Sequence, residues 1–280
     1  LRYIRDVKEG RYNPVPRIDA ASELTRGLQT ADFAGWLNSL PPNTRFYGAM
    51  KQAAQRDIPY LSPAEFVTYR VNMERLRWGE PNLPSQGRWV MLNVGAAELM
   101  AMEGNNVAFG VNVVVGRPTR RTPLSNDKIT GLKFSPDWTP TRSIVQEDYL
   151  NQAQADPAYF DQKGWQVYLD GERTTSASID WTAVDLDKVT VRQPSGAANA
   201  LGGVRFSLTN NRAIYLHDTN AHSLFDKPKR LFSSGCVRVE DASWLAHWIM
   251  GGQPIAMSME QVKANMALGT PKTKRLSRAL

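Results

Sequence analysis

The chain has 280 residues, 42% of them hydrophobic and 22% charged, so it is long enough to bury a core without disulfides or metal ions. The formal charge of +7 favours an anionic partner, but the basic residues are spread out, and no zinc-finger spacing, RNP motif or basic amphipathic helix accompanies them. We therefore expect a solvated basic surface and no nucleic-acid partner. No membrane span is expected, because no stretch approaches the ~20 apolar residues that a bilayer requires.

Residues 1–78 are expected to form a helical region. The predicted helices lie at 30–40, 45–55 and 62–78. Thr30 is the predicted N-cap of the first, and Ser62 with Glu65 is expected to form a capping box at the start of the third. The first ten residues, LRYIRDVKEG, lack the apolar stretch of a signal peptide, although a trimmed mature protein would look the same.

Strand-like periodicity begins at residue 88. The predicted strands lie at 88–94, 97–102, 107–116, 189–193, 204–210 and 212–218, and a further strand within 130–140 ends in a Pro-bracketed tryptophan. Two helices follow, DASWLAHWIMGG (241–252) and SMEQVKANMALG (258–269), the second with a Ser258/Gln261 capping box. Residues 142–187 mix helical, loop and strand patterns and are expected to form an inserted capping segment. The predicted class is α+β, with helices towards both ends of the chain. The domain at 88–280 is expected to be mostly β and to include the C-terminal helices.

The single cysteine, Cys236, follows a Ser-Ser-Gly turn in SSGCVRVED (233–241). A lone cysteine is often a small buried hydrophobe. A nucleophilic cysteine needs a lowered pKa, a base and oxyanion donors. The small residues before Cys236, the helix after it and Arg238 two positions on are compatible with these needs, and His217 ends a predicted strand. From these residues alone, both interpretations remain open.

Several motifs occur in an order that resembles the YkuD-type L,D-transpeptidases, specifically their YcbB-like branch. They are VNMERLRW, VVVGRPTRRTP, LKFSPDWTPTRSI, VRQPSGAANALGGVRFSL, IYLHDT and LFSSGCVRVED, over residues 70 to 245. The chain departs from that branch in one respect. QAAQRDIPYLSPAEF (52–66) runs straight into the next helix and leaves no room for the peptidoglycan-binding module that these proteins often carry.

The resemblance implies roles for ten residues. Cys236 would be the acyl-accepting nucleophile and His217 its base. The residues implied in oxyanion stabilisation or in orienting the histidine are Tyr215, Ser234, Gly235 and Asp218, the last through its backbone carbonyl. Those implied in substrate binding are Arg238, Trp138, Asn199 and Ser233. A structural role is the alternative for several of them: Cys236 as an inert buried thiol, His217 as a core histidine, Arg238 as an ion-pair partner of Glu240, and Tyr215 and Trp138 as ordinary structural residues.

The resemblance also implies a function. It is an exported enzyme of the periplasm or cell envelope that joins peptidoglycan stem peptides through a cysteine thioester and is acylated by carbapenems. The missing module leaves open whether the cross-link is of the 3-3 type or the L-Ala-linked 1-3 type. The alternatives are a thiol L,D-carboxypeptidase or endopeptidase, and a non-catalytic wall-binding protein. No organic cofactor or metal is implied, and one cysteine permits neither an internal disulfide nor a cysteine-based metal site.

Overall fold

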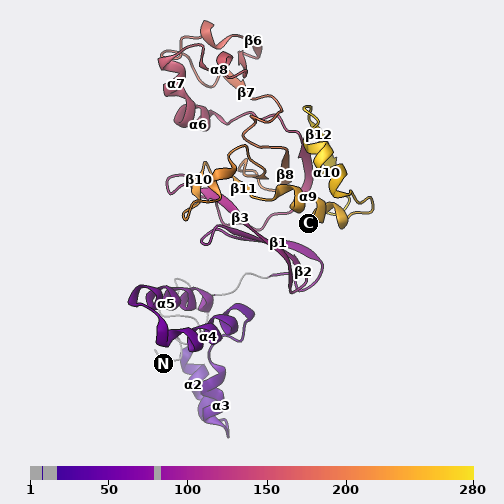
Figure 1. Ribbon diagram of the computed structural model, residues 1–280. Coiled ribbons are helices and arrows are strands. Elements are labelled where there is room, and N and C mark those ends of the chain that lie inside the picture. Colours follow the sequence, from indigo (N-terminus) through magenta and orange to yellow (C-terminus); the bar gives the residue numbers. More distant parts are fainter. Residues whose placement is uncertain (1–7, 9–17, 79–82) are drawn as a thin grey trace. The chain divides into compact units, whose positions relative to one another are not determined.

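The computed structural model describes residue 8 and residues 18–78 and 83–280. The chain divides into two compact units, Leu1–Leu83 and Pro84–Leu280. Figure 1 shows the helices of the first unit in indigo and violet and the second unit in magenta to yellow. The predicted helical region therefore corresponds to the first unit, with residues 1–7 and 9–17 lying outside the described residues.

Within the described residues, the first unit is helical. Its helices are α2 (Ala20–Leu28), α3 (Phe33–Ser39), α4 (Arg45–Asp57), η1 (Ile58–Tyr60) and α5 (Pro63–Arg77). The prediction of Thr30 as the cap of α3 is wrong, because the Asp32 carboxylate accepts the N–H of Gly35 at 2.8 Å and α3 begins after it. The Ser62/Glu65 capping box at the start of α5 is confirmed.

The second unit is built on a nine-stranded sheet with the order β1-β2-β3-β11-β9-β8-β4-β12, and β10 also pairs with β3. The strands are β1 (Arg88–Asn93), β2 (Glu98–Glu103), β3 (Asn106–Gly116), β4 (Ile129–Phe134), β8 (Val204–Leu208), β9 (Leu216–His217), β10 (Leu231–Ser233), β11 (Val237–Val239) and β12 (Lys272–Arg275). The predicted meander of β1, β2 and β3 is confirmed. The basic tail had no strand prediction, but β12 pairs antiparallel with β4.

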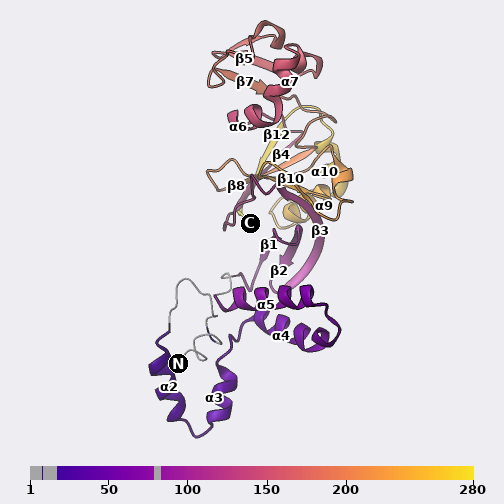
Figure 2. The same cartoon turned by 90° about the vertical axis from the view of Figure 1, so that its left-hand side faces the viewer.

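One face of this sheet packs against α9 (Ala242–Gly251) and α10 (Met259–Met266), which lie beside it in both views (Figures 1 and 2). Leu245, Ile249 and Val262 of these helices are 0% exposed. They join sheet residues such as Leu132 and Phe206 in the principal core. The Ser258/Gln261 capping box of α10 is confirmed. The unit is α+β and mostly β, and the two helices that cover its core, α9 and α10, lie between β11 and β12 in the chain.

An insert leaves the sheet between β4 and β8, and we refer to residues 138–193 by that word. Its elements are α6 (Arg142–Ile144), the π-helix η2 (Val145–Tyr149), α7 (Leu150–Ala155), α8 (Tyr159–Gln162), β5 (Gln166–Leu169), β6 (Glu172–Thr174), η3 (Ser176–Ser178) and β7 (Val189–Arg192). It has its own core around Phe160 and Trp181. Two backbone hydrogen bonds between Trp138 and Gln193, of 2.9 and 2.7 Å, close its base. The predicted strand at 189–193 therefore belongs to the insert's sheet, β6-β5-β7.

Candidate active site

Four polar side chains lie in one row across the main sheet. The register pairs Arg238 with His217, His217 with Arg205, and Arg205 with Lys133. Their neighbours along each strand are buried residues of the principal core. Because side chains alternate between the two faces of a strand, these four project from the face opposite that core. We call them the polar row. It places one imidazole among three cations.

The thiol lies on the same face as the polar row. Cys236 directly precedes β11, and the N–H of Val237 donates to the Tyr215 carbonyl at 2.9 Å. Because Cys236 is two residues before Arg238 and Tyr215 two before His217, their side chains share the face of the row. The register thus puts sulfur and imidazole on neighbouring strands.

The sulfur makes a weak hydrogen bond in this state, from Sγ to the Ala213 carbonyl at 3.6 Å. Among the described residues, its hydrogen bonds do not include one to His217. The pairing of thiol and imidazole therefore stays a prediction, supported by register.

A turn before β9 positions the Ala213 carbonyl that contacts the Cys236 sulfur. The same turn shortens the strand predicted at 212–218 to two residues. The Asn210 carboxamide accepts the N–H groups of Arg212 and Ile214 and donates to the Ile214 carbonyl. Ala213 between them has φ +55°, a left-handed conformation that is uncommon for alanine. Such strained residues cluster at functional sites, and this one presents its carbonyl to the thiol.

The His217 ring is held by the backbone of the next residue. Its Nδ1 lies 2.5 Å from the Asp218 carbonyl oxygen, the group that the sequence analysis assigned to orienting it. A carbonyl accepts only, so Nδ1 carries the proton and Nε2 keeps a lone pair. Burial, with the charges of Arg238 and Arg205, lowers the pKa of His217 to about 3. The imidazole is therefore neutral at neutral pH.

The thiol is neutral as well. Burial raises the pKa of Cys236, and the N–H of Tyr215 and the charges of Arg238 and Arg205 offset this only in part. The lowered thiol pKa that was expected of a nucleophilic cysteine is not found, because the pKa of Cys236 is raised. Ionisation of this thiol would therefore need a base that takes its proton.

A pH dependence of stability follows from the buried neutral imidazole. The pKa of His217 is about 3 when folded and 6.5 when exposed, so between these values the unfolded chain binds a proton that the folded chain does not. Stability should therefore fall as pH decreases from 6.5, by about 1.4 kcal/mol per pH unit from this group. Urea unfolding of the parent and of His217→Gln at several pH values isolates the term. The free-energy gap between the two should change in favour of the variant on acidification, and a constant gap would contradict it.

The loop before the thiol is held by internal hydrogen bonds. Ser233 Oγ donates to the Cys236 carbonyl at 2.5 Å and accepts the Gly235 N–H at 3.1 Å. The Gly235 carbonyl accepts from Thr122 Oγ1 at 2.9 Å, and Gly235 has φ +116°, which favours glycine. Two expectations change. Ser233 is 3% exposed and braces the loop instead of binding substrate, and the Gly235 N–H is already used.

Asn199 does not line a cleft, contrary to expectation. It is 1% exposed, and its amide donates to the carbonyls of Gln193 and Pro194 while its oxygen accepts the N–H of Leu201. It therefore braces the chain where the insert returns to the sheet. Trp138 is half-buried at the base of the insert.

Trp138 packs edge-on against two aromatic side chains of the insert, Tyr149 and Trp165, with ring centroids 6.3 and 5.8 Å apart. Tyr149 in turn lies near the polar row. Burial first, with the charges of Asp148 and Tyr159, raises its pKa to about 12, against the opposing effect of Arg238. An aromatic wall thus extends from Trp138 toward Arg238.

Arg238 has no ion-pair partner among the described residues. Its Nη1 donates weakly to Thr219 Oγ1 at 3.5 Å, and its buried Nε has no acceptor there. The alternative partner, Glu240, instead accepts the N–H of Asn112 at 3.3 Å. Unsatisfied guanidinium donors beside a thiol suit a carboxylate ligand, because the planar fork of arginine matches it.

The insert contacts the loop before Cys236, which we call the nucleophile loop after the role predicted for the thiol, through a residue that was not predicted as a site residue. Asp148, in the π-helix η2, accepts Ser234 Oγ at 2.9 Å and forms a 2.8 Å ion pair with Arg117. Glu147 also pairs with Arg117, at 3.1 Å. A π-turn within a helix is rare and frequent at functional sites. The opposite charges of QED (146–148) and GRPTRR (116–121) are the sequence feature that could have predicted this contact.

We expect Asp148→Asn to loosen this contact. The amide removes the charge that Arg117 binds, a loss of about 1 kcal/mol for a partly exposed pair, so Cys236 should become more accessible. Alkylation by iodoacetamide, followed by intact mass, should accelerate about fivefold. Glu172→Gln, at the exposed tip of β6, is the control and should react like the parent. Equal rates in Asp148→Asn and parent would contradict the contact.

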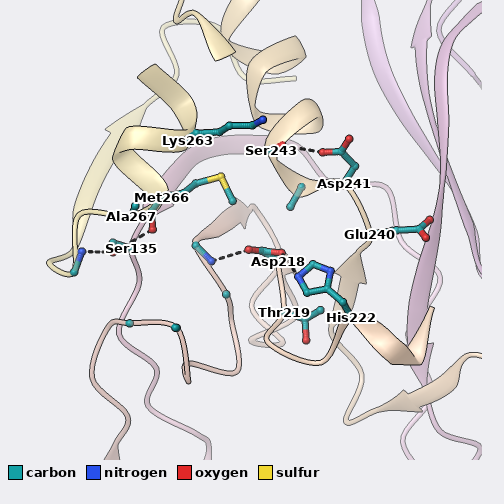
Figure 3. Close-up of a pocket in the computed structure, with 16 residues that line it drawn as sticks. Ser135, Asp218, Thr219, His222, Glu240, Asp241, Ser243, Lys263, Met266 and Ala267 are labelled. Carbon is teal, nitrogen blue, oxygen red and sulfur yellow. Dashed lines mark hydrogen bonds and ion pairs between the residues drawn. The ribbon is translucent and has the colours of Figure 1, made fainter. Parts of the chain in front are cut away.

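A cavity of about 580 Å³ is lined by the loop after β9, the start of α9 and the side of α10 (Figure 3). The Asp218 carboxylate points into it and accepts the Gly203 N–H at 2.8 Å, and His222 Nε2 is 3.8 Å from it. A side chain at Gly202, which has φ +59°, would meet this carboxylate at 2.4 Å. The cavity thus touches the site through Asp218, whose carbonyl holds His217.

Within the described ranges, no group of three or more His, Cys, Asp or Glu side chains is arranged to hold a metal ion. No helix in the same ranges combines the length and hydrophobicity of a membrane span.

Comparison with known proteins shows the family to which the second unit is similar. The family model of the YkuD L,D-transpeptidase catalytic domain matches residues 87–257. A Haemophilus influenzae protein named "Putative L,D-transpeptidase" is 28% identical over 263 residues, which are 92% of this chain and 52% of that protein. The chain therefore spans about half the length of this curated relative. The matched range contains the polar row, Cys236 and the insert.

Proposed function

The chain belongs to the YkuD L,D-transpeptidase family, and on that premise we propose that it is a peptidoglycan L,D-transpeptidase acting through a thioester on Cys236. The observation that carries the proposal is the strand register, because it puts the only cysteine and a neutral histidine on one face of the sheet, beside two arginines.

Acylation comes first. The Cys236 sulfur attacks the carbonyl carbon after the L-centre of a donor stem peptide while its proton passes to Nε2 of His217. The C–S bond forms and the C–N bond to the following D-residue breaks. The imidazolium returns its proton to the departing amine. A neutral imidazole whose Nδ1 is held by the Asp218 carbonyl has the required lone pair from the outset, which supports His217 as general base.

Transfer to the acceptor completes the cycle. The amine of a second stem attacks the thioester carbonyl and gives a proton to His217, the cross-linking amide forms, and the sulfur leaves and regains its proton. The insert supports transfer over hydrolysis: its Asp148 contact with Ser234 brings it to the thiol, where it can exclude water. The N–H of Tyr215, which interacts with the Cys236 sulfur, is a candidate for stabilising the oxyanion.

The substrate fixes further parts of the proposal. Peptidoglycan lies outside the cytoplasmic membrane, so we place the protein in the periplasm or cell envelope. Arg238 holds a carboxylate of the donor, and Trp138 with Tyr149 forms a wall for it. Carbapenems acylate Cys236 by the same attack. The cross-link is of the 3-3 or the L-Ala-linked 1-3 type.

Incubation with purified disaccharide-peptides carrying tri-, tetra- or pentapeptide stems tests the proposal. Mass spectrometry should find dimers that have lost the D-residue after the attacked L-centre, and fragmentation reports the linkage. Trimmed monomers without dimers would indicate a thiol hydrolase instead. Binding to sacculi with no product would indicate a non-catalytic wall-binding protein.

A further inference from the structure

Arg205 is a second cation beside the site whose charge is not balanced by a carboxylate among the described residues. Its Nε is buried without an acceptor there, and its Nη2 makes only a long 3.4 Å bond to Ser207 Oγ. Its guanidinium lies over the Tyr215 ring, with Cζ 4.5 Å from the centroid. This contact fixes the guanidinium on the face that carries Cys236. An unpaired, partly buried cation is costly, so its position needs a reason.

Arg205 and Arg238 flank His217 on the two neighbouring strands, β8 and β11. Adjacent strands are about 4.8 Å apart, so the backbones of the two arginines are separated by roughly 10 Å with the imidazole between them. Both guanidinium charges lie close enough to Cys236 and His217 to lower the pKa of the thiol and that of the imidazole. They therefore offer two anion sites, one on either side of the base.

Lys133, the third cation of the polar row, has its charge balanced by a carboxylate. It forms an ion pair with Asp137, which also pairs with Arg192. The sequence thus supplies a carboxylate to the cation farther from the thiol. Among the described residues it supplies none to the two cations that flank the base. The lack of carboxylate partners for Arg205 and Arg238, within the part of the chain that is described, favours a role in binding an anionic ligand over a role in a structural ion-pair network.

We propose that Arg205 and Arg238 form a two-point clamp that selects donor stems with two free carboxylates, one on each side of His217. The inference rests on the proposed function and deepens it, because it makes Arg205 a specificity-determining residue. Stems whose carboxylates are amidated lose one or both contacts. They are poorer donors for a reason of charge, not of size.

The clamp also has a consequence for the base. The two arginine charges help to hold the imidazole neutral, and carboxylates bound to them cancel that effect. The imidazole then accepts the thiol proton more readily. A doubly anionic donor therefore binds more tightly and also raises the basicity of the imidazole, which must take the proton of the Cys236 thiol. Amidation of the donor should thus affect both KM and kcat.

Donor peptides test selectivity directly. With a diacid donor, Arg205→Gln should lose about tenfold in kcat/KM, and Arg205→Lys, which keeps the charge, should lose less. With the amidated donor of the same length, parent and Arg205→Gln should be equal within twofold. Arg173→Gln, an exposed arginine of β6, is the control and should match the parent on both. Equal losses on both donors in Arg205→Gln would mean a structural role and overturn the clamp.

Thiol alkylation tests the clamp without any peptide. Iodoacetate is anionic and iodoacetamide neutral, so the ratio of their rates with Cys236, relative to the ratio with glutathione, reports the anion preference of the site. We expect a ratio raised several-fold in the parent and in Arg173→Gln, and lowered at least threefold in Arg205→Gln. A ratio equal in parent and Arg205→Gln would overturn the clamp even if cross-links form. If the parent turns over no peptide, the proposed function fails while this ratio still decides the clamp.

Discussion

Replacing Cys236 by alanine is expected to abolish cross-linking, with a loss of roughly a thousandfold or more in kcat. The sulfur is the atom that forms and breaks the acyl bond, so no remaining group can substitute for it, and a catalytic nucleophile acts as a unit with its base. The fold should survive, because the loop is held by Ser233, Gly235 and Thr122 rather than by the thiol.

Intact-mass spectrometry after incubation with a carbapenem tests whether Cys236 is the residue that becomes acylated. The parent should gain the mass of one inhibitor, and Cys236→Ala should gain none while keeping the melting temperature of the parent. An adduct that persists in Cys236→Ala would place the acylated group elsewhere. A parent that never forms an adduct would weigh against a thioester mechanism.

Replacing His217 by glutamine is expected to slow acylation by about a hundredfold to ten-thousandfold, the usual contribution of a positioned base. The reason is specific to this site. Since burial raises the pKa of Cys236, little thiolate exists at neutral pH, and without the imidazole the thiol must ionise unaided. The residual rate of the variant should therefore rise steadily with pH, whereas the parent rate is high already at neutral pH.

The matched control is His222→Gln. His222 lies five residues on, in the 3-10 turn η4 (His222–Leu224), with 61% of its side chain exposed. Acylation rates from stopped or quenched reactions at several pH values should show this variant following the parent. If His217→Gln keeps the parent's rate and pH profile, the imidazole is not the base, and the orientation of its ring by Asp218 has a purely structural meaning.

Local interactions explain which elements could be predicted. The capping boxes Ser62/Glu65 and Ser258/Gln261 satisfy helix-end N–H groups within three residues, and the turns of the β1–β3 meander are equally short-range. Where a local pattern offered two solutions, the prediction failed. Thr30 fits the pattern of an N-cap, but the Asp32 carboxylate caps the helix instead. Asn210 likewise builds a turn into a stretch with strand periodicity.

Long-range pairing and burial explain the rest. The strand β12 forms because β4 offers it an edge, and nothing in KTKR alone indicates a strand. Ser233 and Asn199 look like site residues in the sequence, and only burial shows that their polar groups are used internally.

By itself, the sequence determined the family, the α+β class and the candidate pair Cys236 and His217, because ordered motifs and periodicity are properties of the chain read along its length. The tertiary structure alone decided that Arg205 lies beside His217, that Asp148 meets the nucleophile loop, and that both thiol and imidazole rest neutral. Those facts depend on which strands become neighbours and on how much water the packed sheet excludes, and neither is encoded within a few residues of the groups concerned.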